Sequence, residues 1–325
     1  MEYGGSGTLP VPIDANPHAE CHVMTKIEKI LGLKFSLLNL YLRLNTRIWQ
    51  RLPSDLRNTE LMRLYGKFLH QIICQRADRR QFTNTFFFRN RPELELMCRL
   101  TREKTEGATL DIAVLGCSIG AEVYSISMTI RKLRPDLNVH IFAIDNSAEV
   151  LKVAKDAVYT SQSISLAGSS MFERITEAVF VEMFEGDRHE AKVRPWIREG
   201  TSWHLGDASD PELVRAFGSQ DMVVASNFLC HMKPSEAEYC LRNIARLVKS
   251  GGYLFVTGID LDVREKVARE LRWRPVSELI EEIHEGDPSV RGDWPCAWWG
   301  LEPLDKKRVD WQLRYAVVFQ LNEDD

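Results

Sequence analysis

The chain has 325 residues, of which 44% are hydrophobic and 27% are charged, and its formal net charge is −4. A net negative charge argues against a nucleic-acid partner, because phosphate backbones are bound by clustered Lys and Arg. Seven cysteines with no C-x-x-C pair favour reduced thiols over disulfides or a metal site. No run reaches the roughly 20 apolar residues that span a bilayer, and residues 1–17 lack a signal-peptide pattern, so we expect a cytoplasmic protein without membrane insertion.

Two domains are predicted along the chain. Residues 1–22 are expected to be a flexible tail, and residues 23–90 are expected to form a small N-terminal helical domain. Apolar residues recur there at helical intervals, with one break at Pro53. Pro92 suits the first turn of a further helix. The second predicted domain comprises residues 91–325.

Strand and helix patterns alternate from residue 91 onward, which predicts an α/β fold with a doubly wound, mostly parallel sheet. The predicted strands are 111–115, 139–144, 221–225 and 252–257, and the predicted helices include 121–133, 147–156 and 234–249. The interval 159–205 is too long and too mixed for one crossover and predicts an insert. Residues 261–325 form an extension rich in tryptophan, in which 311–321 is predicted to be a final, antiparallel strand.

The stretch 111–124 carries the strongest signal for a ligand. An apolar strand runs into a loop with Gly116 and Gly120, after which a helical pattern begins. This arrangement builds the nucleotide pocket of open α/β sheets, but the spacing G-x-x-x-G differs from the G-x-G-x-x-G of dinucleotide sites. Glu122 would repel a pyrophosphate and attract a cation. The loop therefore favours S-adenosylmethionine, which has an ammonium, a sulfonium and no phosphate.

Polar residues also follow two other predicted strands. Asp145 ends the second strand, where a carboxylate can accept both ribose hydroxyls. A dehydrogenase uses an acid similarly, so Asp145 alone does not separate the two cofactors. Asn227 and Phe228 follow the strand that ends at residue 225, at the edge where ligands of such sheets bind.

Several segments, in a consistent order, resemble the CheR-type family of chemotaxis-receptor glutamate methyltransferases. Residues 83–89, 116–125, 143–151, 226–232 and 248–255 resemble the family's N-x-T-x-F-F-R, C-S-x-G-E-E-P-Y-S, D-I-D-x-E-V-L, R-N-V-x-x-Y-F and L-K-P-G-G-Y-L-F elements, respectively. The resemblance covers about residues 25–260. It implies a class I, Rossmann-like methyltransferase that uses S-adenosyl-L-methionine and releases S-adenosyl-L-homocysteine.

The resemblance and the loop together give a set of expected cofactor-binding residues: Thr85, Arg89, Gly116, Ser118, Gly120, Glu122, Asp145, Asp207, Ala208, Asn227 and Phe228. Arg89 is implied to pair with the cofactor carboxylate, with a structural salt bridge as the alternative. Asp207 stands near the implied adenine position, with loop capping as the alternative. Two departures from the family concern the cofactor: Thr83 occupies its Asn position, with Asn84 one residue off, and Ala121 replaces a second acid.

Departures on the acceptor side weaken the case for a receptor glutamate. Ser226 replaces the family's Arg and His231 replaces its Tyr, and the side chains at both positions are implied to face the substrate glutamate. A carboxylate nucleophile needs only positioning, whereas a hydroxyl or an amine also needs a base. We therefore expect His231 and Ser226 to be catalytic, with His231 as the base. Trp298 and Trp299 are candidate substrate contacts, with packing as the alternative.

These observations predict a methyltransferase that O-methylates a carboxylate or hydroxyl on a small molecule or on a protein other than a chemoreceptor. The alternatives are a chemoreceptor glutamate methyltransferase, a non-catalytic sensor or scaffold that binds the cofactor, and a nicotinamide oxidoreductase. Arg43, Arg47 and Arg51, on one face of a predicted helix, suit either protein docking or a solvated surface. The expected partner is a methyl acceptor, and no metal is expected.

Overall fold

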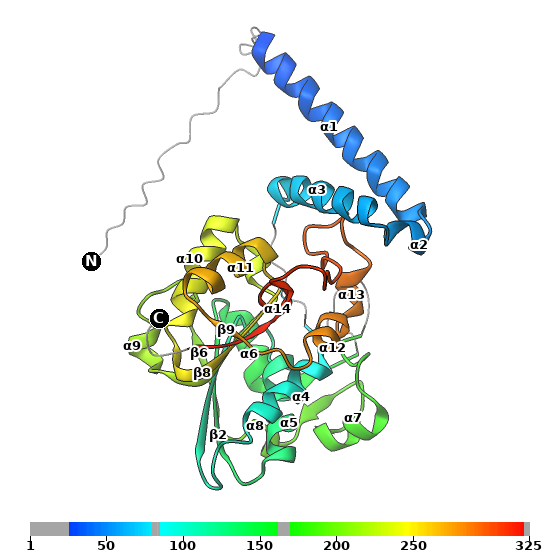
Figure 1. The fold of residues 1–325 in the computed structure, drawn as a ribbon. Coiled ribbons are helices and arrows are strands. Elements are labelled where there is room, and N and C mark those ends of the chain that lie inside the picture. The colour runs from blue at the N-terminus through cyan, green and yellow to red at the C-terminus, as the bar shows by residue number, and fades with distance from the viewer. Residues whose placement is uncertain (1–25, 80–82, 84, 162–169, 322–325) are drawn as a thin grey trace, which may run out of the picture. The chain divides into compact units, whose positions relative to one another are not determined.

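The structure is a computed structural model that describes residues 26–79, 83, 85–161 and 170–321. The predicted tail, residues 1–22, and the loop residue Asn84 lie outside the described residues. The chain divides into two compact units, residues 1–62 and 63–325 (Figure 1).

The N-terminal part of the chain is helical, as its apolar spacing predicts. It consists of α1 (Lys26–Arg51), α2 (Ser54–Arg57) and α3 (Glu60–Arg76). Pro53 lies in the break between the first two helices, because its extended backbone (φ −56°, ψ 146°) precedes the first residue of α2.

The second unit contains a seven-stranded sheet with the order β6-β2-β1-β7-β8-β10-β9. Its strands are β1 (Thr109–Leu115), β2 (Asn138–Asp145), β6 (Thr201–Leu205), β7 (Gln220–Ser226), β8 (Val248–Thr257), β9 (Arg274–Pro275) and β10 (Val318–Gln320). The five strands from β6 to β8 pair in parallel, and β10 runs antiparallel to both of its neighbours. This topology confirms the predicted doubly wound α/β sheet.

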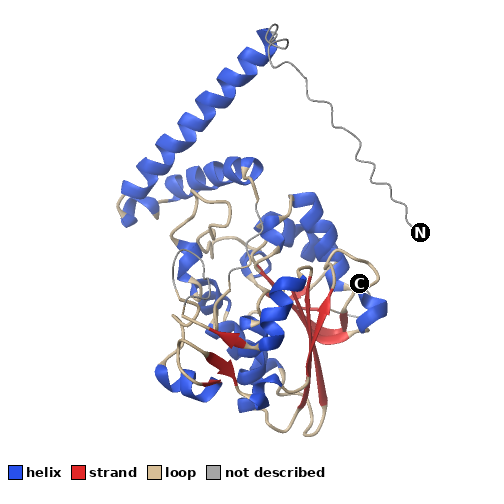
Figure 2. Ribbon diagram, turned by 180° about the vertical axis from the view of Figure 1, so that it is seen from behind, coloured by secondary structure: helices blue, strands red, loops and turns tan. Residues whose placement is uncertain are grey.

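Helices cover both faces of this sheet (Figure 2). The helices from residue 91 onward include α4 (Arg91–Leu100), α5 (Ala121–Leu133), α6 (Ala148–Asp156), α8 (Pro195–Arg198), α9 (Leu213–Phe217), α10 (Pro234–Ala245), α11 (Leu261–Glu270), α12 (Ile280–Glu285), α13 (Pro288–Arg291) and α14 (Trp311–Tyr315). The short 3-10 helix η2 (Leu229–His231) follows β7. No helix among the described residues is long and apolar enough to cross a membrane.

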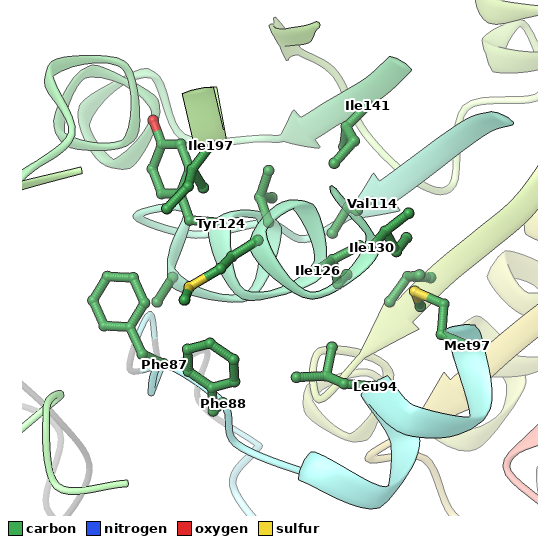
Figure 3. Packing of buried hydrophobic residues seen from close by; sticks show 14 of the residues in the cluster. Phe87, Phe88, Leu94, Met97, Val114, Tyr124, Ile126, Ile130, Ile141 and Ile197 are labelled. Atoms are coloured by element: carbon green, nitrogen blue, oxygen red, sulfur yellow. The ribbon is translucent and has the colours of Figure 1, made fainter. Parts of the chain in front are cut away.

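Strand β1 shows how the two layers of the core arise. Successive side chains of a strand point to opposite faces, so Ile112 and Val114 join one buried cluster while Ala113 and Leu115 join the other. In the first cluster, side chains from α4 and from the segment before it pack against α5 and the sheet (Figure 3).

The interval 159–205 contains the predicted insert and also one strand of the main sheet. Strands β3 (Val158–Tyr159), β5 (Ala191–Val193) and β4 (Phe184–Glu185) form a separate antiparallel sheet, and α7 (Glu177–Met183) precedes β4. The end of the interval forms β6 and belongs to the main sheet.

Two predicted boundaries were wrong. The helix expected over 234–249 ends at Ala245, and the residues after it begin β8. The strand expected over 311–321 is confined to β10, while its first half forms α14. Apolar spacing alone does not separate helix from strand in so short a run. Helix α14 is held in place by its residues Arg314 and Tyr315, which both donate to the carboxylate of Glu302 at 2.8 Å.

Candidate active site

A small cavity lies at the carboxyl ends of β1, β2 and β7. Its lining residues are Thr83, Thr85, Arg89, Gly116, Cys117, Ser118, Glu122, Asp145, Ser226, Asn227 and Phe228. Most of the expected cofactor-binding residues therefore meet at one place. Gly120, Asp207 and Ala208 do not line this cavity.

Glycine is needed at the two loop positions for different structural reasons. Gly116 has φ +64°, and a Cβ there would come within 2.7 Å of the Phe228 ring. Gly120 has φ +86° immediately before α5, and a Cβ there would come within 2.7 Å of Trp203. Gly116 thus lets Phe228 line the cavity, whereas Gly120 lets α5 begin close against β6.

Asp145 joins the loop after β1 to the start of α6. Its buried carboxylate accepts hydrogen bonds from the backbone N–H of Ser118 (2.8 Å, to Oδ2) and of Ser147 (2.9 Å, to Oδ1). A carboxylate oxygen accepts more than one hydrogen bond. Asp145 therefore keeps acceptor capacity toward the cavity, as a ribose-binding role requires.

Glu122 lies in the first turn of α5, where the helix dipole favours a negative charge. Burial raises the pKa of Glu122, while the nearby Ser226 hydroxyl and the positive charge of Arg89 oppose the rise. A buried carboxylate in this setting is stabilised further by a cationic ligand. Ser226 lines this small cavity, but it does not line the larger cavity that holds His231. The structure therefore gives no support to its expected catalytic role.

Arg89 takes part in an ion-pair network that the sequence did not reveal. Its Nε donates to Asp287 Oδ2 at 2.7 Å, and Arg174 Nη2 donates to Asp287 Oδ1 at 2.8 Å. Arg174 also donates to the backbone carbonyl of Arg89. The structural salt bridge is thus present. The Nη groups of Arg89 form no hydrogen bond with the described residues, which leaves them for a carboxylate in the cavity.

Asp287→Asn is expected to weaken binding of S-adenosylhomocysteine about tenfold, because Arg89 loses the charge that orients it. Calorimetric titration measures the effect. The same substitution should leave the affinity for 5′-methylthioadenosine, which lacks the amino-acid carboxylate, within about twofold of wild type. An equal loss for both ligands would mean that Asp287 acts only on the fold.

Asp207 is exposed and caps a turn, since its Oδ1 accepts from the backbone N–H and the hydroxyl of Ser209 at 2.8 and 2.7 Å. The Ala208 carbonyl accepts from Asn243. The structure therefore shows the loop-capping alternative for Asp207. The contact of this segment with adenine stays a prediction.

A second cavity, of about 740 Å³, adjoins the first. Arg89, Glu122 and Asn227 line both cavities. The larger one is bounded by α3, α4, the turn from β8 to α11, and the C-terminal extension. His231, Trp298 and Trp299 all line it, so the structure brings the candidate base and the candidate substrate contacts together.

The aromatic wall of the larger cavity is ordered by specific contacts. The His231 ring meets Trp298 edge-on, with centroids 5.2 Å apart and an interplanar angle of 76°. Trp298 meets Trp299 at 5.1 Å in the same manner, and Trp299 Nε1 donates to Asp293 Oδ2 at 2.7 Å. Both indoles line the cavity. Trp298 is also buried, so it serves packing as well, whereas Trp299 is exposed.

Arg79 fixes the segment that carries His231. Its Nη1 donates to the carbonyls of Cys230 and Met232 at 3.0 and 3.1 Å, and its Nη2 pairs with Asp260 at 2.8 Å. The guanidinium also lies 5.5 Å from the Trp298 ring centroid. Arg79 was not among the site residues predicted from the sequence.

Glu93, on the first turn of α4, was also missed by sequence reasoning. It lines the larger cavity, and 8% of its surface is exposed. Burial, followed by the negative charge of Glu122, raises the pKa of Glu93 to about 8.

Glu93→Gln is expected to make the protein more stable at high pH. The carboxyl binds its proton more tightly in the folded state, so wild type loses stability as the pH rises from about 4.5 through about 8. The variant should unfold with a free energy higher than wild type by a few kcal/mol at pH 9, and about equal to wild type at pH 4.5. Urea unfolding at the two values measures this difference. A constant difference between the two proteins would show that Glu93 does not titrate as described.

No group of three or more His, Cys, Asp or Glu side chains within the described ranges is placed to hold a metal ion.

The comparison with protein families decides between the two cofactors, S-adenosylmethionine and a nicotinamide dinucleotide, that Asp145 alone does not separate. The model of the CheR methyltransferase SAM-binding domain matches residues 83–267, more than half of the chain. The chain belongs to the CheR methyltransferase family. S-adenosylmethionine is therefore the cofactor of this domain. The lining of the small cavity has the chemistry that it requires, with Glu122 and Asp145 as acids that could accept from its ammonium and ribose, and Arg89 as a cation for its carboxylate.

Two curated proteins illustrate the relationship within the CheR family. A probable biofilm formation methyltransferase, WspC from Pseudomonas aeruginosa, is 30% identical over 64% of this chain and 48% of its own length. A chemotaxis protein methyltransferase from Listeria monocytogenes is 25% identical over 53% of this chain and 63% of its own length. The chain thus spans about half to just under two thirds of these relatives.

Among solved structures, the magnesium protoporphyrin IX methyltransferase ChlM from Synechocystis PCC 6803, with bound SAM, is similar in fold. It aligns with a TM-score of 0.33 and 13% identity, over 68% of this chain and 85% of that chain.

Proposed function

We propose that this CheR-family chain transfers the methyl group of S-adenosylmethionine to an oxygen atom of a small molecule held in the larger cavity. The observation that carries the proposal is the cavity itself. Its volume of about 740 Å³ falls in the range of small-molecule sites, about 300–1,000 Å³. It shares three lining residues with the cofactor cavity and holds His231 beside Trp298.

Different residues of the chain would bind different groups of the cofactor. Glu122 would accept from its ammonium, the Nη groups of Arg89 would pair with its carboxylate, and Asp145 would accept from its ribose hydroxyls. Asn227 and Phe228 line the cavity beside them. When bound, S-adenosylmethionine supplies a methyl group activated by a positively charged sulfur.

His231 acts as the base that prepares the acceptor. A neutral hydroxyl is a weak nucleophile, and a positioned base contributes about 10²–10⁴-fold to its rate. His231 takes the hydroxyl proton at a ring nitrogen, the oxygen lone pair forms the new bond to the methyl carbon, and the carbon–sulfur electron pair stays on sulfur. Arg79 keeps this histidine in place through the carbonyls on either side of it.

A second candidate acceptor is a glutamate side chain of a protein, since one relative is a chemotaxis protein methyltransferase. Ser226, which stands in place of the family's Arg, offers no positive charge to a carboxylate. The larger cavity is lined by eight acidic and five basic side chains, counted from its lining residues. That excess of acidic side chains disfavours an anionic acceptor, so we favour a small molecule over a protein glutamate as the methyl acceptor.

Calorimetric titration with S-adenosylmethionine and S-adenosylhomocysteine tests the cofactor half of the proposal. We expect micromolar binding of both and no binding of NADH. Failure of both to bind would overturn the proposal and the sensor alternative together. Binding that is never followed by S-adenosylhomocysteine formation in the presence of cell extract would favour a sensor or scaffold.

A further inference from the structure

Glu93 is a buried acid whose carboxyl has no partner among the described residues. Its backbone N–H donates to Asn90 Oδ1, as expected near a helix start. Its carboxyl oxygens form no hydrogen bond or ion pair with the described residues, although only 8% of its surface is exposed. Ionising a buried carboxyl that has no partner is strongly unfavourable, in keeping with its raised pKa. Its position beside a cavity therefore points to a cationic ligand group that stabilises the carboxylate form.

Two arginines lie near Glu93, and neither forms an ion pair with it. Arg89 directs its Nε to Asp287. Arg264, also buried, donates from Nη1 to the Val256 carbonyl at 2.9 Å and from Nη2 to the Arg314 carbonyl at 3.0 Å. Neither guanidinium comes within ion-pair distance of Glu93, so both moderate its charge only from farther away.

The missing partner belongs to the acceptor side of the site. Glu122 lines both cavities and is placed to receive the cofactor ammonium, whereas Glu93 lines only the larger cavity. Eight acidic and five basic side chains surround that cavity. The ring faces of Trp298 and Trp299, where they meet the cavity, attract cations.

We propose that Glu93 binds a cationic nitrogen on the methyl acceptor. The acceptor is then a small molecule that carries an amine, protonated at neutral pH, in addition to the oxygen that receives the methyl group. This inference rests on the proposed function, because it names the class of molecule that enters the larger cavity. It also accounts for an acid that the fold does not use.

Calorimetric titration of the full chain, saturated with S-adenosylhomocysteine, tests the inference with two matched probes. Phenethylammonium carries a positive charge on an aromatic body, and 3-phenylpropionate carries a negative charge on a body of the same length. We expect the ammonium to bind at least tenfold more tightly than the carboxylate. Glu93→Gln should weaken the ammonium at least tenfold without changing the affinity for S-adenosylhomocysteine.

Glu95→Gln is the matched control, because Glu95 lies exposed on the same helix and pairs with Arg99. It should leave the binding of both probes unchanged. Equal binding of the ammonium to wild type and Glu93→Gln, tighter binding of the carboxylate, or no binding of the ammonium would each overturn the inference. If S-adenosylhomocysteine itself does not bind, the proposed function fails, and the ammonium titration on the chain alone still decides the role of Glu93.

Discussion

Asp145→Ala is expected to reduce the affinity for S-adenosylhomocysteine by about 100-fold or more. Each hydrogen bond to a charged acceptor contributes about 1.5–3 kcal/mol, and the ribose offers two donors to this carboxylate. The substitution also releases the backbone N–H groups of Ser118 and Ser147, which shape the cavity. Calorimetry measures the loss, and thermal unfolding shows whether the variant remains folded.

Asp111→Ala provides the control for this experiment. Asp111 lies on the neighbouring strand β1, away from its carboxyl end, where it pairs with His140 at 3.3 Å on a partly exposed surface. Its loss should leave cofactor affinity unchanged. Micromolar affinity retained by a folded Asp145→Ala protein would contradict the ribose assignment.

His231→Phe is expected to lower turnover by about 10²–10⁴-fold, the usual contribution of a positioned base. Phenylalanine keeps an aromatic ring against Trp298, so the cavity wall and the affinity for S-adenosylhomocysteine should change little. Turnover is measured as S-adenosylhomocysteine released with the acceptor-containing extract. His189→Phe, on the exposed part of the insert, should have wild-type turnover. Undiminished turnover in His231→Phe would mean that the acceptor needs no base, as a carboxylate would not.

The sheet and the cofactor loop could be predicted because their signals are local. The buried strands β1, β2 and β7 each contain an apolar run, and the predicted bounds lie within two residues of the observed ones. Helix α5 follows the glycine loop as its spacing predicts. The polar residues Asp145 and Asn227 end strands, and parallel strands bring their carboxyl ends to one edge.

The rest of the site depends on contacts between distant segments. Asp287 meets Arg89 across nearly 200 positions of sequence, and no local pattern marks such a pair. Glu93 reads as an ordinary acid in a first helical turn until the fold buries it beside a cavity. Trp298 and Trp299 were singled out by the density of tryptophans alone. Only the structure places Trp298 against His231 and Trp299 against Trp298.

The most direct test of the proposed methyl transfer to a small molecule uses S-adenosylmethionine with an isotopically labelled methyl group. The enzyme and this cofactor are added to a lysate of the cells whose genome encodes the chain. The products are separated into protein and small-molecule fractions, with Asp145→Ala as the blank. The account predicts label in the small-molecule fraction, absent from the blank. Label that appears only in the protein fraction, or in neither fraction, would contradict it.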